Sequence, residues 1–185
     1  LDVSKFQRYI EWITGMLAGD FGVSYTYRVP VSELVQSRLG VSIPLALYAI
    51  LLSTIIALPV GLFAAANHGG FRDWSVMGFT QLGIAIPNFW FAMVLVLIFS
   101  IYLKWFSAGG VPGWEAGILL NLKALTLPAF ALALPQASIL ARVMRSAIID
   151  TLSQDYFRTA RASGLTYAQA IFRHAFRNAL IPVLT

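Results

Sequence analysis

Three long stretches of this chain contain no charged residue, and they constrain the fold more than any other feature. They cover residues 39–71, 74–103 and 124–141. A helix of about 20 apolar residues crosses the hydrocarbon core of a bilayer. Inside lipid a segment must satisfy its own backbone hydrogen bonds, which favours helices. The sequence therefore predicts an all-α, polytopic transmembrane helical bundle.

The composition agrees with a chain surrounded by lipid. Of the 185 residues, 58% are hydrophobic and 11% are charged, whereas a soluble domain carries about 25% charge. Cysteine is absent, which excludes disulfides, thiolate nucleophiles and cysteine metal sites. The only histidines are His68 and His174, too few for a histidine-built metal site. We therefore expect neither a metal nor another cofactor.

The apolar stretches predict spans at about 41–66, 75–103 and 124–141, with a fourth from 178 onward. The chain is thus expected to be a fragment with about three complete spans, divided into a segment 1–40 and a transmembrane domain 41–185. Prolines are expected to kink or bend the spans, and two arginines are expected to end the third. These residues are Pro59, Pro87, Pro128, Pro135, Arg142 and Arg145.

The segment 1–40 is the most polar third of the chain. Apolar residues recur at helical spacing from about Ser4 to Leu17, which predicts an amphipathic helix. Two glycines in the following G-D-F-G-V-S stretch are expected to end it. This helix either lies on the membrane surface or has a docking role, and the sequence does not decide between the two.

The distribution of basic residues predicts the orientation. Six arginines lie within 142–177, whereas the loop between the second and third spans holds only Lys104 and Lys123. Because short cytoplasmic loops are enriched in Lys and Arg, we expect 142–177 to be cytoplasmic and 1–40 to be extracytoplasmic. The net charge of +5 follows this membrane topology, so nucleic acid is not an expected partner.

The segment from Asp155 to Pro182 predicts a helix, a glycine turn and a second helix. Gly164 is the residue expected to end the first helix in a left-handed conformation. Thr166 and Gln169 have the spacing of a capping box for the second helix. One face of that helix is apolar, formed by Leu165, Ala168, Ile171, Ala175 and Ala179.

The string Y-F-R-T-A-R-A-S-G-L, followed by R-H-A-F-R-N-A-L-I-P, resembles the cytoplasmic loop of ABC importer permease subunits. It is most similar to the branch that imports dipeptides, oligopeptides and nickel. The general motif of these subunits is E-A-A-x3-G. Arg158 and Thr159 replace its first two residues, and the closing Pro182 comes late. The alternative interpretation is that this segment is a solvated basic loop that no partner recognises.

The resemblance implies both a site and a set of partners. Its ATPase-coupling residues would be Asp155, Tyr156, Arg158, Thr159, Ala160, Arg161, Ala162, Gly164 and Leu165, supported by His174, Arg177, Asn178 and Pro182. The implied partners are a second permease subunit, two ATPase subunits, an extracytoplasmic solute-binding protein and the lipid bilayer. The implied location is the inner membrane of a bacterial or archaeal cell. The permease itself would not be an enzyme.

Three polar residues inside the apolar stretches are candidates for a substrate path: Gln81, Asn88 and Gln136. Asn88 could equally be a hydrogen-bonding contact between helices. I-P-N-F-W around it also resembles the same permeases.

The sequence contains no obvious energy-converting chemistry. It has no G-x-x-x-x-G-K-[ST], H-E-x-x-H or G-x-S-x-G motif. We place no Asp, Glu or Arg inside a span, where a secondary transporter would use one. An ion-driven transporter, and an intramembrane enzyme or scaffold, remain the rival classes.

Overall fold

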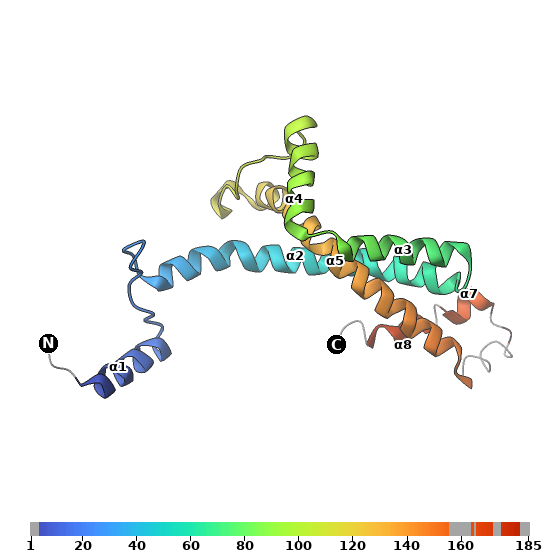
Figure 1. Cartoon of the computed structure of the whole chain (residues 1–185), viewed down its shortest axis with the longest axis horizontal. Coiled ribbons are helices and arrows are strands. Elements are labelled where there is room, and N and C mark those ends of the chain that lie inside the picture. Colours follow the sequence, from blue (N-terminus) through green and yellow to red (C-terminus); the bar gives the residue numbers. More distant parts are fainter. Residues whose placement is uncertain (1–3, 156–163, 165, 172–174, 182–185) are drawn as a thin grey trace. The chain divides into compact units, whose positions relative to one another are not determined.

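The computed structural model describes residues 4–155, 164, 166–171 and 175–181, and it is helical through most of them. The chain divides into two compact units, 1–44 and 45–185. The elements are α1 (Lys5–Leu17), α2 (Val31–Ala66), α3 (Phe71–Ala85), α4 (Asn88–Val96), the π-helix η1 (Leu97–Tyr102), the 3-10 helix η2 (Trp114–Ala116), α5 (Ile118–Leu152), α7 (Tyr167–Ala170) and α8 (Phe176–Ala179), drawn in Figure 1.

The first unit contains the predicted amphipathic helix. Ser4 is the N-cap of α1, and its hydroxyl accepts a hydrogen bond from the Gln7 N–H at 3.2 Å. No residue of α1 is buried. The following turn is held by Asp20, whose carboxylate accepts the Gly22 N–H at 2.9 Å. The helix is confirmed, whereas its role at the membrane surface stays a prediction.

α2 begins at Val31, ten residues earlier than the predicted start of the first span. The polar residues before the apolar stretch are compatible with a helix. Glu33 lies in the first turn, where a negative charge interacts favourably with the helix dipole. The helix continues without interruption past Pro44 and Pro59. It is long and apolar enough to cross a membrane.

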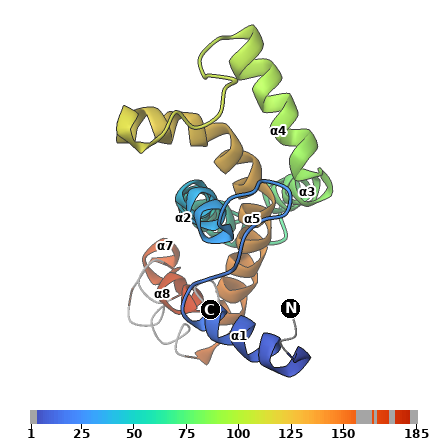
Figure 2. The same cartoon turned by 90° about the vertical axis from the view of Figure 1, so that its left-hand side faces the viewer.

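α5 is also longer than the predicted third span, and it extends beyond it at both ends. Arg142 and Arg145 do not end the helix, which continues to Leu152. Arginine is a good helix former, and both guanidinium groups find polar partners on α3. Pro128 and Pro135 lie inside α5. Figure 2 shows that this helix changes direction along its length.

The predicted second span is not one helix. α3 and the α4–η1 helix meet at an angle of 95°, and Figure 2 shows α4 turning away from α3. Ile86 adopts an extended conformation, with φ −79° and ψ 124°, because Pro87 disfavours the helical region for the residue before it. Proline was expected to interrupt this span, but the sharp bend was not. The pair is either one broken span or a re-entrant element.

The second unit is packed around α5. Ala57 of α2 is buried with Ala137 and Ala141 of α5. Gly61 of α2 comes so close that an added Cβ would lie 2.6 Å from the Ala141 carbonyl oxygen. On α3, a Cβ at Gly83 would overlap the Ser138 hydroxyl. Small residues at helix crossings allow such close approach in membrane proteins, so α5 is held tightly between α2 and α3.

Candidate functional site

The described part of the predicted coupling segment has the local geometry that the sequence indicates. Gly164 has φ +89°, the left-handed conformation expected of it. The Thr166 N–H donates to Gln169 Oε1 at 3.0 Å, and the Gln169 N–H donates to Thr166 Oγ1 at 3.3 Å. This reciprocal pair is the predicted capping box. It begins α7, so the glycine turn leads directly into a helix.

The apolar face of this segment packs on α5. Ile171, Ala175 and Ala179 are buried, as the predicted stripe requires, together with Ala170. They form one cluster with Met144 and Ile148 of α5 and Ala65 of α2. Leu58 and Leu62 of α2 pack against its edge. The segment is therefore fixed to α5 by apolar contacts.

Only some of the predicted coupling residues can be placed. Asp155, Gly164, Arg177 and Asn178 are exposed. The others lie outside the described residues: Tyr156, Arg158, Thr159, Ala160, Arg161, Ala162, Leu165, His174 and Pro182.

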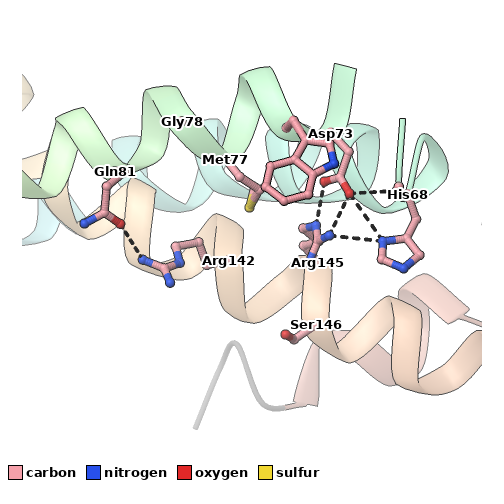
Figure 3. A pocket seen from close by; sticks show the side chains of 10 residues that line it. His68, Asp73, Met77, Gly78, Gln81, Arg142, Arg145 and Ser146 are labelled. Carbon is pink, nitrogen blue, oxygen red and sulfur yellow. Dashed lines mark hydrogen bonds and ion pairs between the residues drawn. The ribbon is translucent and has the colours of Figure 1, made fainter. Parts of the chain in front are cut away.

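A buried ion pair joins α3 to α5 (Figure 3). Asp73, in the first turn of α3, has a side chain only 3% exposed. Arg145 of α5 donates to both of its oxygens, from Nε to Oδ1 and from Nη2 to Oδ2, each at 2.6 Å. A two-bond fork of this kind fixes the orientation of both side chains.

Two groups from the loop before α3 complete this cluster. The Gly69 N–H donates to Asp73 Oδ2 at 3.0 Å. His68 Nδ1 lies 3.3 Å from the same oxygen and 3.0 Å from Arg145 Nη2. The carboxylate therefore holds the loop, the start of α3 and the C-terminal part of α5 in one arrangement.

The ion pair borders a cavity of about 500 Å³ between α3 and α5. Arg142 also lines this cavity, one turn before Arg145, and donates to Gln81 Oε1 of α3 at 3.0 Å. Trp74 and Met77 form part of its apolar wall. Within the described residues, no group of three His, Cys, Asp or Glu side chains could hold a metal ion.

The three candidates for a substrate path are not gathered in this cavity. Gln81 lines it, whereas Asn88 and Gln136 do not. Both of those side chains are exposed in the isolated chain. Asn88 is the first residue of α4, directly after the bend. Their role in a path stays a prediction.

The buried charge corrects the sequence analysis, which placed no Asp or Arg inside a span. α3 begins at Phe71, so Asp73 belongs to a candidate span, and Arg145 lies within α5. The missed signal was an acid, Asp73, directly before one apolar stretch and a base, Arg145, shortly after another. The two charges can neutralise each other only when the two helices are adjacent. The sequence does not reveal which helices are adjacent.

These features define a helical membrane protein. The apolar helices are long enough to cross a bilayer, and a segment with a glycine turn and a capped helix is anchored on one of them. Residues 57–185 match the family described as the inner membrane component of binding-protein-dependent transport systems, and the chain belongs to this family. The expected all-α fold and inner-membrane location are thereby confirmed.

Individual relatives are similar over nearly the whole chain. It is 39% identical to the oligopeptide transport system permease protein AppB of Bacillus subtilis, over all of this chain and 60% of that protein. It is 37% identical to OppB of Haemophilus influenzae, over all of this chain and 59% of that protein. For OppB of Salmonella typhimurium the identity is 39%, over 96% of this chain and 56% of the relative. The chain thus spans about three fifths of these relatives' length.

Proposed function

We propose that this chain forms most of the permease subunit of an ATP-driven importer that moves a small solute, a di- or oligopeptide, across the inner membrane. The observation that carries the proposal is identity of 37–39% to proteins named as oligopeptide transport permeases. The similarity extends across both units of the chain and includes the coupling segment.

The coupling segment is proposed to dock on a separate ATPase subunit. Its apolar face is buried against α5, while Gly164 and Arg177 are exposed. A docking element needs an exposed surface on a short rigid body and a firm connection to the spans. The capping box and the apolar cluster provide rigidity and connection. Asp155, Arg158 and Arg161 are proposed to contribute to the docking surface.

The proposed cycle uses partners that supply what this chain lacks. Two ATPase subunits would hydrolyse ATP, a second permease subunit would complete the path, and an extracytoplasmic binding protein would deliver the solute. Closure of the ATPases would displace the coupling segment and, through α5, tilt the spans between two orientations. Gln81, Asn88 and Gln136 are proposed to face the path in the assembled transporter.

Uptake by the complete importer tests this function. The full-length permease, its partners and a loaded binding protein would be assembled in proteoliposomes, with ATP supplied on the side of the ATPases. Labelled di- and oligopeptides should accumulate only with ATP and the binding protein. Nickel chelates and glutathione serve as competing solutes. Uptake that needs no ATP and stops when ionophores collapse the ion gradients would instead identify a secondary transporter.

A further inference from the structure

We propose that Asp73 and Arg145 are positioning residues, which transmit displacement of the coupling segment from α5 to the bent α3–α4 pair. The inference rests on the proposed function and adds a route by which the docking signal reaches the spans. It concerns neither the docking surface nor the solute path itself.

The first argument is the position of Arg145 on α5. The preceding residue, Met144, and Ile148, one turn further along, are both fully buried in the cluster that holds the coupling segment. Arg145 projects from the same part of the helix toward α3. A movement of the coupling segment that displaces Met144 and Ile148 must therefore displace Arg145 as well.

The second argument is the rigidity of the link to α3. Both Arg145–Asp73 bonds measure 2.6 Å, and the Asp73 side chain is almost completely buried. Asp73 also accepts the Gly69 N–H, so it cannot rotate freely. A displacement of Arg145 would consequently move the first turn of α3 and the loop before it.

The third argument concerns what a buried ion pair contributes. Removing two charges from solvent offsets much of their attraction, and apolar replacements of such pairs are often neutral or stabilising. Stability therefore does not explain this pair well, whereas fixing one relative arrangement of two helices does. α3 leads directly into the 95° bend before Asn88, so a displacement of α3 reaches α4 through this bend.

The alternative is that the pair only holds the folded chain together. Single and double substitutions separate the two roles. Arg145→Gln leaves the buried Asp73 carboxylate without its partner, and Asp73→Asn leaves the partly buried Arg145 without its own, so both should reduce abundance. The double variant removes both charges and keeps a polar group at each position, so it should recover abundance. Arg72→Gln is the matched control, because Arg72 is exposed in the same turn of α3.

The experiment compares solute uptake per ATP hydrolysed in the assembled importer. The double variant should keep its ATPases bound but transport at least about fivefold less solute per ATP than the parent, at the low end of coupling between sites. Arg72→Gln should match the parent. If the double variant has the parental ratio of solute transported to ATP hydrolysed, the proposal is overturned and the pair has a structural role only.

Hydrogen exchange provides a readout that does not depend on transport. The Gly69 amide, which donates to Asp73, should exchange faster in the double variant than in the parent. Unchanged exchange at Gly69 would refute the link between the pair and the loop, whatever the uptake result. A parent importer that fails to use ATP would instead refute the proposed function, and the exchange measurement would still test the pair.

Discussion

Adding one methyl group at Gly61 should separate α2 from α5. The new Cβ would lie 2.6 Å from the Ala141 carbonyl oxygen and 2.7 Å from the Met144 Cβ, whereas ordinary contacts begin at 3.4 Å. The oxygen belongs to the helix backbone and cannot rotate away. The two helices would therefore have to part by about 0.8 Å at this crossing, or distort locally.

The energy of this change follows from two opposing effects. Replacing glycine by alanine inside a helix favours folding by up to about 1 kcal/mol. Overpacking a tight contact costs about 1–3 kcal/mol. Gly61→Ala should therefore destabilise the fold by up to about 2 kcal/mol. Gly78→Ala is the control, because no described residue comes within 4 Å of its added Cβ, and it should keep the favourable effect.

Unfolding of the full-length protein in mixed detergent micelles measures this difference. The titration adds SDS and follows helix content by circular dichroism. Gly61→Ala should unfold at a lower SDS fraction than Gly78→Ala, and the two variants should differ by about 1–3 kcal/mol. Equal stability of Gly61→Ala and Gly78→Ala would refute the close α2–α5 crossing.

Three further predictions concern topology, the solute path and the helix cap. A single cysteine at Ser153 should be labelled only from the cytoplasm and one at Ser107 only from outside; labelling of both from one side would contradict the orientation. Asn88→Leu should insert normally but reduce uptake or alter its selectivity, and parental uptake of every solute would limit Asn88 to packing. Thr166→Ala should lose about 0.5–2 kcal/mol of cap stability, seen as faster amide exchange over 167–170; parental exchange there would mean that the capping box does not stabilise α7.

Features determined by neighbouring residues could be predicted from the sequence. The apolar stretches identify α2 and α5 because hydropathy acts over a single helix. Gly164 and the Thr166–Gln169 capping box were predicted because a turn and a cap depend on residues within one helical turn.

Features determined by distant residues could not be predicted in the same way. Arg145 was expected to end the third span, but its charge is paired with Asp73 and the helix continues. The sequence could not show this pairing, because Asp73 lies 72 positions away. Arg142 likewise binds Gln81, 61 positions away. The interruption at Pro87 was predictable, but its 95° angle depends on how α4 and η1 pack against α5. The ion pair and its cavity therefore emerged only with the structure.

Substitution of Gly164 tests the central claim, that the segment following α5 couples the spans to an ATPase. Gly164 has φ +89°, and among the described residues none comes within 4 Å of an added Cβ. Gly164→Val would therefore strain the turn, by about 1 kcal/mol or more, without overlapping the core. Gly19→Val is the matched control, because Gly19 has φ +83° and equally open space in the other unit.

The decisive measurement is co-purification of the ATPases with each full-length variant, together with stimulation of their ATP hydrolysis by loaded binding protein. Gly164→Val should insert at parental abundance, bind the ATPases weakly and lose the stimulation, whereas Gly19→Val should keep both. Normal transport by Gly164→Val with its ATPases still bound would contradict the assignment of this segment as the coupling element.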